Sequence, residues 1–272
     1  MNILKKVIQF YRLLNLLSVD VAIGAMCSSV FFAHIFQADI TYFSILSLGL
    51  SVWIIYTADH LLDAKKMKAS ATTDRHRLHQ QHFRLLLIMM IIVAGINAVV
   101  LFYIRKPALI TGVVLIVLVI LYLLIQHSLK FLKELFVAVV YTAGVLIPAT
   151  SNTEMIWRDW PWMVIVQFAL VALLNLVIFS WFDYENDLKD NRVSFVTIFG
   201  RKVSQIFIVF LFVLSAILIV VTLSFGIETT ILFVMNGTLL FMFLFHSYFA
   251  HHDRYRLLGD AAFFIPVFVL FF

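Results

Sequence analysis

Two pairs of aspartates share one spacing in this sequence. Asp59 and Asp63 close one apolar segment, and Asp183 and Asp187 follow another. Residues four positions apart lie on the same face of a helix, with Cβ atoms about 5–6 Å apart, so each pair can present two carboxylates to one ligand. Carboxylates at a helix C-terminus repel each other and the helix dipole. A divalent cation offsets that cost, and Mg²⁺ typically binds one or two carboxylates together with water and substrate phosphate.

Basic residues accompany both aspartate pairs. They follow the pairs in sequence or stand at the ends of neighbouring apolar segments, and they include Lys65, Arg75, Lys130, Lys133, Lys189 and Arg192. Aspartates and cations around one opening can bind a diphosphate, through bridging metal ions and direct charge-assisted hydrogen bonds. Part of this positive charge also follows the general enrichment of Lys and Arg in cytoplasmic loops of membrane proteins.

Membrane-spanning helices must position these residues. Of the 272 residues, 63% are hydrophobic and 13% are charged. Soluble domains carry about 45–50% apolar and about 25% charged residues, so the composition excludes a soluble globular protein, and it is the opposite of a disordered chain. The single cysteine, Cys27, excludes a disulfide framework and a thiolate zinc site.

The apolar segments predict an all-α, polytopic protein with nine transmembrane helices. A span needs roughly 20 mainly apolar residues, and the last segment is short for one. No linker divides the chain, so residues 1–272 are expected to form a single membrane domain. The nine predicted spans are 13–36, 40–58, 85–104, 108–126, 134–151, 162–182, 203–225, 229–250 and 258–272.

The distribution of basic residues predicts the orientation. With the N-terminus in the cytoplasm, all of the 20 Lys and Arg residues except Arg105, Lys106 and Arg158 fall on the inner side, as the positive-inside rule requires. Both aspartate pairs then lie at the cytoplasmic face, and nine spans put the C-terminus outside. We expect a multi-pass protein of a bacterial plasma membrane. Its net charge of +5 reflects this asymmetry, and nucleic acid is not an expected partner.

The arrangement resembles the UbiA superfamily of intramembrane prenyltransferases. Members of that family have nine helices, with one aspartate-rich motif after the second helix and another after the sixth. The second motif is the better match: the run from Asp183 and Asp187 through Ser194 to Phe199-Gly200 is similar to the family's run from its paired aspartates to a Ser and a closing Phe-Gly.

The remaining similarities cover most of the chain in topology but are less specific. Asp59 and Asp63 match the two later aspartates of the first motif, whereas Ile55 stands where the family has Asn. Further matches are Arg12 and Asn15 in the first helix, Arg75 near the family's Arg-Pro-Leu, and the stretch from Tyr122 to Lys130 after the fourth helix.

The resemblance implies an enzyme that transfers a prenyl group from an isoprenyl diphosphate to a lipophilic acceptor within the bilayer, with Mg²⁺ as cofactor. Its catalytic and metal-binding residues would be the four aspartates, and a metal ion neutralises the leaving group as the C–O bond ionises. The candidate contacts to phosphate oxygens are Arg75, Lys130 and Arg192. A quinone precursor, a tetrapyrrole and a lipid headgroup all remain open as acceptors.

Further candidate substrate-binding residues lie next to the motifs and inside the first span. An allylic cation survives only where water is excluded, and the ring of Tyr184 could stabilise it or simply pack. Asn15 and Asp20 are polar residues within the membrane, which are functional candidates by default; Asp20 fits a hydrogen bond between helices equally well.

Two other functions remain as alternatives. His76, His79 and His82 follow one another at steps of three, and His251-His252 lies in the last inner loop. Imidazole suits iron, so a di-iron lipid desaturase or hydroxylase is one alternative, although it leaves the aspartates unexplained. The other is a non-catalytic protein that binds or transports prenyl lipids.

Overall fold

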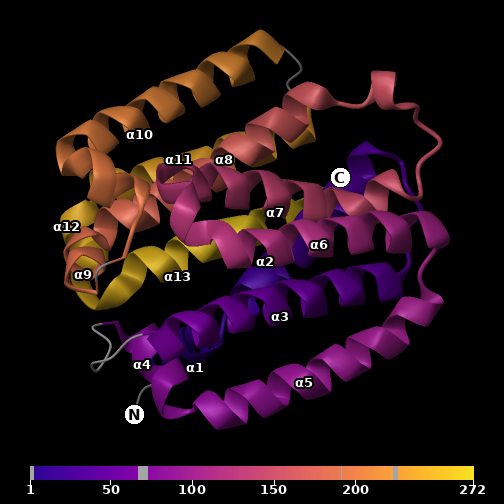
Figure 1. Ribbon diagram of the computed structural model, residues 1–272. Coiled ribbons are helices and arrows are strands. Elements are labelled where there is room, and N and C mark those ends of the chain that lie inside the picture. Colours follow the sequence, from indigo (N-terminus) through magenta and orange to yellow (C-terminus); the bar gives the residue numbers. More distant parts are fainter. Residues whose placement is uncertain (1–2, 67–72, 191, 223–225) are drawn as a thin grey trace.

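Seven helices of the computed structural model are long and apolar enough to cross a membrane. The structure describes residues 3–66, 73–190, 192–222 and 226–272, and within these ranges every regular element is helical (Figure 1). The prediction of an all-α, polytopic membrane protein is therefore confirmed. The seven are α3 (Tyr42–Lys66), α5 (Phe83–Val100), α6 (Lys106–Leu129), α7 (Lys133–Thr150), α8 (Trp162–Phe182), α10 (Phe195–Thr222) and α11 (Ile227–Leu244).

The predicted first span, 13–36, is divided by a sharp break. Helices α1 (Ile3–Leu16) and α2 (Val19–Ile35) meet at 83°. Ser18, which lies at the break, has φ 56°, a left-handed conformation that is uncommon for a residue with a side chain. Counting the bent pair as one span raises the total to eight.

The predicted last span, 258–272, falls in two short elements. Helix α13 (Arg254–Ala261) has eight residues and continues into the 3₁₀ helix η5 (Ala262–Phe271), which has ten. Neither is long enough by itself to count among the membrane-crossing helices of the described residues, so the predicted count of nine is not confirmed. The N- and C-termini lie at opposite ends of the bundle in Figure 1.

Short helices gather at the end of the bundle that carries the N-terminus (Figure 1). Helix α4 (Asp74–Gln81) is capped by Thr73, whose hydroxyl accepts a hydrogen bond from the backbone of His76 and so satisfies a free helix N–H group. Helix α9 (Tyr184–Lys189) follows α8 directly, and α12 (His246–Ala250) lies nearby. The remaining 3₁₀ helices are η1 (Leu101–Tyr103), η2 (Lys130–Leu132), η3 (Trp157–Asp159) and η4 (His251–Asp253).

The glycine that closes the second predicted motif has a structural reason. Gly200 lies inside α10 with φ 80°, a backbone conformation that glycine adopts without the steric cost that a side chain would add. It separates a first turn that begins at Phe195 from the long remainder of the helix.

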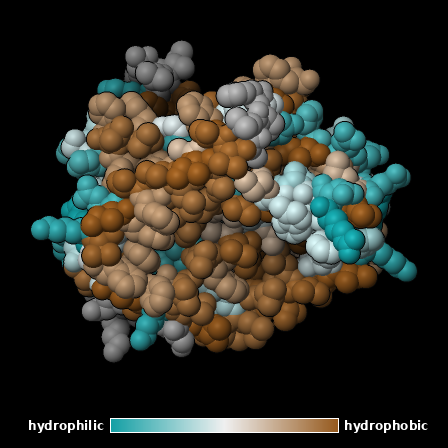
Figure 2. All heavy atoms as spheres, turned by 90° about the horizontal axis from the view of Figure 1, so that it is seen from above, coloured by the Kyte–Doolittle hydropathy of each residue, from teal (hydrophilic) through white to brown (hydrophobic). Residues whose placement is uncertain are grey.

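Helix α8 forms the centre of the bundle, and α5 and α6 form its edge. In the apolar window of α8, 56% of the residues are buried, compared with 11% in α6. The core packs aromatic rings edge to face, as in the pairs of Phe168 with Phe32 and with Phe263. Apolar side chains also cover most of the face shown in Figure 2, between two polar ends, as expected for a surface in contact with lipid.

A close helix contact at a glycine predicts a stability effect. A Cβ atom on Gly24 of α2 would lie 2.9 Å from Cβ of Phe263 in η5, so a side chain there must push the two helices apart. We expect Gly24→Ala to lower the free energy of unfolding by about 1–3 kcal/mol, the usual cost of overpacking. Thermal unfolding of the purified protein in detergent measures this.

Gly95→Ala is the matched control. No atom lies within 4 Å of a Cβ at Gly95 in α5, so this substitution should be neutral or raise stability by up to about 1 kcal/mol, through helix propensity. An equal or higher melting temperature for Gly24→Ala would contradict the packing of α2 against η5.

Candidate active site

One cavity brings the two aspartate pairs together. It has a volume of about 240 Å³, and Asp59, Asp183 and Asp187 all line it. Asp63 lies beside it, in an ion pair of 2.5 Å with Arg192, which also lines the cavity. The pairs come from the last turns of α3 and from the junction of α8 with α9, segments that are more than 100 positions apart in sequence.

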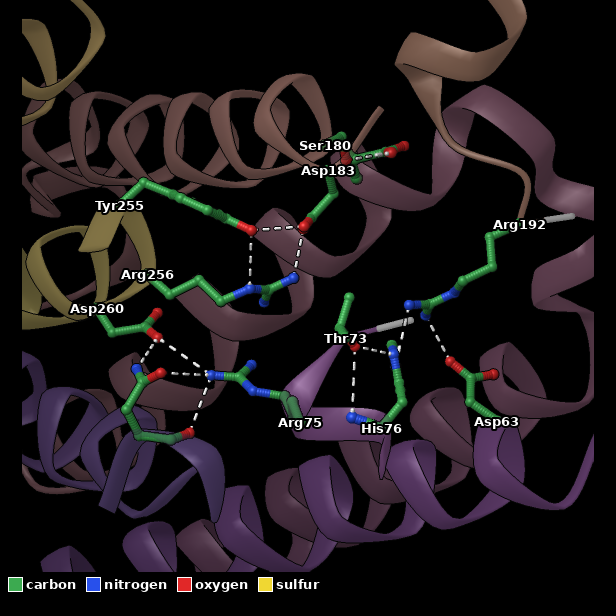
Figure 3. A network of polar contacts seen from close by, with 12 residues as sticks. Asp63, Thr73, Arg75, His76, Ser180, Asp183, Arg192, Tyr255, Arg256 and Asp260 are labelled. Carbon is green, nitrogen blue, oxygen red and sulfur yellow. Dashed lines mark hydrogen bonds and ion pairs between the residues drawn. The ribbon is translucent and has the colours of Figure 1, made fainter. Parts of the chain in front are cut away.

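Arg192 connects the first aspartate pair to helix α4 (Figure 3). Its guanidinium donates hydrogen bonds to Asp63 and, over 3.0 Å, to Nε2 of His76. Because Nε2 accepts that bond, Nδ1 of His76 carries the proton and can donate to the Thr73 hydroxyl, 2.7 Å away. Burial lowers the pKa of His76 to about 2, and Arg192 acts in the same direction. His76 is therefore a neutral support for Arg192.

Both oxygens of Asp183 are held by residues of α13 (Figure 3). Tyr255 donates its hydroxyl to Oδ1 over 2.5 Å, and the guanidinium of Arg256 pairs with Oδ2. Asp183 and Tyr255 are buried. Tyr255 and Arg256 were not among the predicted site residues. The available signal was a pair of polar residues next to the last predicted span, facing the same end of the bundle as the motifs.

The other two aspartates are not part of these ion pairs. Asp59 accepts a hydrogen bond of 3.3 Å from the amide of Gln126. Asp187 is buried in the first turn of α9. Burial raises the pKa of Asp187 to about 6, with Asp183 acting in the same direction and Arg192 opposing it. A bound cation would favour the ionised form of such a carboxylate.

A second group of buried polar residues is centred on Asn15 and Arg75. The amide nitrogen of Asn15 donates to Asp20 over 2.5 Å and to Asp260 over 2.8 Å. Arg75 donates to the backbone and side-chain oxygens of Asn15 over 2.9 and 3.1 Å, and its guanidinium lies 3.7 Å from Asp260. All four side chains are buried, and Asp20 is completely inaccessible to solvent. Asp260 was not predicted.

The predicted substrate-binding residues differ in their relation to the cavity. Arg75 and Arg192 line it, and Asn15 stands behind it as the partner of Arg75. Lys130 and Tyr184 are not among the described residues of its wall, where Lys133 lies instead. The chain has φ 48° at Lys130, just before α7 begins, a turn that sequence spacing did not reveal. Tyr184 packs against the hydrophobic core.

The histidines whose side chains the structure describes do not form the cluster that a di-iron site needs. The ring of His60 has its centroid 5.9 Å from that of His76 and 5.0 Å from that of His79. His79 is hydrogen-bonded to the backbone oxygen of Arg75. His82 is exposed. Across the described ranges, no three or more His, Cys, Asp or Glu side chains are arranged to hold a metal ion by themselves. The geometry gives the di-iron alternative no support.

A second, apolar cavity adjoins the first. Its volume is about 170 Å³, and it shares wall residues with the polar cavity, namely Ile55, Tyr56, Tyr122, Val137 and Tyr141. It follows α6 from Tyr122 to Ala108, a distance of ~21 Å at 1.5 Å per residue. Small residues such as Gly112 and Gly144 leave space in its walls.

Comparison with solved structures identifies the fold. A UbiA homolog from Aeropyrum pernix K1 matches with a TM-score of 0.68 and 12% sequence identity, over 92% of this chain and 98% of that one. The chain has the UbiA fold. A UbiA homolog from Archaeoglobus fulgidus, bound to DMAPP and Mg²⁺, matches with a TM-score of 0.63 and 14% identity, over 94% of this chain and 99% of that one.

A third structure extends the comparison of folds. Digeranylgeranylglyceryl phosphate synthase matches the chain with a TM-score of 0.52 and 16% identity, over 96% of this chain and 98% of that one. No protein-family model matches the sequence, and neither does any curated protein sequence. The UbiA fold predicted from the aspartate motifs is thus established by structure, whereas sequence comparison finds no relative.

The buried cluster around Asn15 predicts a large loss of stability on truncation. Asn15→Ala removes the donor to Asp20 and Asp260 and an acceptor from Arg75. Since hydrogen bonds to charged groups contribute about 1.5–3 kcal/mol each, we expect a loss of at least about 3 kcal/mol in the free energy of unfolding, measured by thermal or denaturant unfolding in detergent.

Asn97→Ala provides the comparison. Asn97 is also buried, but it makes a 2.9 Å hydrogen bond to the neutral hydroxyl of Ser51, so its loss should cost about 0.5–1.5 kcal/mol. Equal destabilisation by the two substitutions would show that the hydrogen bonds of Asn15 to charged groups contribute no more than a hydrogen bond between neutral groups.

Proposed function

We propose that this chain is a prenyltransferase of the UbiA superfamily that takes its prenyl group from an isoprenyl diphosphate in a Mg²⁺-dependent reaction. The observation that carries the proposal is the meeting of Asp59, Asp183 and Asp187 at one buried cavity, with Asp63 beside it. Four basic side chains line the same cavity: Arg75, Lys133, Arg192 and Arg256. The structural neighbour from Archaeoglobus fulgidus, with bound DMAPP and Mg²⁺, supports this assignment.

The donor set of the cavity fits magnesium. Carboxylate oxygens are the hard ligands that Mg²⁺ prefers, and it usually keeps further positions for water and substrate phosphate. Among the described residues no three or more carboxylate or imidazole side chains are arranged to hold an ion by themselves, so water and phosphate oxygens would have to complete its coordination. Asp59 and Asp187 are the first candidates to hold the ion, because Asp63 and Asp183 are paired with guanidinium groups.

The side chains of the cavity bind and orient the diphosphate. When bound, Mg²⁺ would stabilise the negative charge that develops on the leaving diphosphate. Arg192 and Arg256 can donate bidentate hydrogen bonds to phosphate oxygens, for which the planar guanidinium is well suited. Lys133 adds a point charge on the same wall. His76 keeps Arg192 in place through its acceptor nitrogen.

The prenyl chain would bind in the apolar cavity. It opens from the polar cavity between Tyr56, Tyr122 and Tyr141, so a donor with its diphosphate at the aspartates can extend its hydrocarbon between α3, α6 and α7. The mostly apolar lining of this cavity would limit the access of water to the reacting carbon, which an allylic cation requires. Aromatic rings at the junction can stabilise positive charge by about 0.5–2 kcal/mol each.

Donor binding tests the role of the aspartates. Asp187→Asn and Asp59→Asn should each weaken Mg²⁺-dependent binding of geranyl diphosphate at least about tenfold, because each removes a negative ligand without changing the size of the side chain. Isothermal titration with the purified full chain measures this. Asp39→Asn changes an exposed aspartate outside the cavity and should leave the affinity unchanged. Binding that persists in both cavity variants, or that ignores Mg²⁺, would refute the proposal.

Prenyl chain length tests the role of the apolar cavity. Gly112 lines it, and no atom lies within 4 Å of a Cβ there, so Gly112→Phe should fill the space without straining the helix. We expect weaker binding of geranylgeranyl diphosphate by at least about tenfold and little change for dimethylallyl diphosphate, in a competition assay.

Gly95→Phe controls for the added ring. A Cβ at Gly95 would likewise have no atom within 4 Å, and Gly95 lies on exposed α5 outside both cavities. This variant should bind both donors as the unmodified protein does. Loss of the short donor in Gly112→Phe would indicate general disruption and contradict the assigned chain path.

A further inference from the structure

One wall of the polar cavity is left free by the proposed donor. The prenyl chain would leave between α3, α6 and α7, and the diphosphate would occupy the aspartate end. The opposite wall comes from α2, α8, α13 and η5. Away from the aspartate end it includes Val21, Ala172, Asn175, Phe179, Asp260 and Phe263. This part of the wall is mostly apolar and aromatic. Its polar groups are the Asn175 amide and the Asp260 carboxylate, and the guanidinium of Arg75 lies 3.7 Å from Asp260 at its edge.

The polar groups of this wall are hydrogen-bond acceptors, so a ligand that binds here should carry a hydrogen-bond donor. Oδ1 of Asn175 is buried and has no hydrogen-bond partner among the described residues, and a buried acceptor without a donor costs about 1–3 kcal/mol. It lies next to the chain at Asp260, since a Cβ on the preceding Gly259 would be 2.6 Å from it. An anionic ligand would meet the Asp260 carboxylate here, whereas a hydroxyl group could donate to either acceptor.

Asp260 is placed to take a proton. One of its oxygens accepts from Asn15, and the other is turned away from Arg75 (Figure 3). Asp20 and Asp260 share the amide nitrogen of Asn15, with oxygens 2.5 and 2.8 Å from it. Two buried carboxylates held this close favour the uptake of a proton, because like charges in a low dielectric repel.

We propose that this wall binds the acceptor, that the acceptor is an uncharged lipophilic molecule with a hydroxyl group, and that Asp260 is the base that receives the hydroxyl proton; this inference rests on the proposed prenyl transfer. The hydroxyl oxygen forms a bond to C1 of the prenyl group. The bond between C1 and the diphosphate oxygen breaks, and its electron pair leaves with the diphosphate. The hydroxyl proton moves to the Asp260 carboxylate, and nothing is oxidised or reduced.

The test separates prenyl transfer from donor ionisation. The full chain in detergent is given geranyl diphosphate and Mg²⁺ with 4-butylphenol, 4-butylanisole or 4-butylbenzoate. Two products are measured: released diphosphate and the geranyl aryl ether. The unmodified protein should form the ether from 4-butylphenol and no product from the anisole or the benzoate.

Asp260→Asn should slow ether formation at least about 100-fold, the usual contribution of a general base. Donor affinity and diphosphate release without acceptor should stay within about twofold. Asp39→Asn is the control, because it makes the same chemical change at an exposed aspartate outside the cavity. This variant should form the ether at the unmodified rate.

Several results would overturn the inference. They are an unchanged ether rate in Asp260→Asn, an equal loss in Asp39→Asn, equal use of the benzoate, and diphosphate release without any prenylation of the phenol. Each of these leaves donor binding intact and so leaves the proposed function standing. Failure of the unmodified protein to bind the donor or to release diphosphate would refute the proposed function itself.

Discussion

The constraint on which this structure depends is the burial of several carboxylates in a largely apolar bundle. An unpaired buried charge is strongly destabilising, so each one requires a partner. Five carboxylates and four basic groups line the described wall of the polar cavity. Because the negative and positive charges nearly balance, the aspartates can lie close to one another without a bound ligand. Asp63 is neutralised by Arg192 and Asp183 by Arg256, and these pairs join helices that are far apart in sequence.

The irregular elements of the fold serve this pairing. The break between α1 and α2 brings Asn15 and Asp20, which lie on either side of Ser18, within hydrogen-bonding distance of each other. Helix α13 brings Tyr255 and Arg256 to Asp183 and, one turn later, Asp260 to Asn15 and Arg75. One short helix therefore contributes residues to both polar clusters, which requires it to lie between the longer helices.

The sequence predicted the parts of the site that local pattern determines. The spacing within each aspartate pair and the hydropathy of the segments between them were sufficient to predict an all-helical membrane protein, and the resemblance of the two motifs to the UbiA superfamily implied its fold. They could not predict which cation faces which carboxylate, because that depends on helix rotation and on turns such as the one at Lys130. The cavity therefore has Lys133 where Lys130 was expected. Asp260 was missed because a single Asp next to a short apolar segment has no distinctive spacing.

The ion pairs also explain how the proposed ligand could enter a buried, charged site. A diphosphate would offer Arg192 and Arg256 new anionic oxygens, and a cation held first by Asp59 and Asp187 would add positive charge beside Asp63 and Asp183. Binding would then exchange the partners of existing charges, with little additional desolvation, since all four side chains are already largely removed from water. The pairs would thus hold the two motifs near their working positions before binding. Such preorganisation lowers the cost of assembling a charged transition state, because the dipoles need little rearrangement during the reaction.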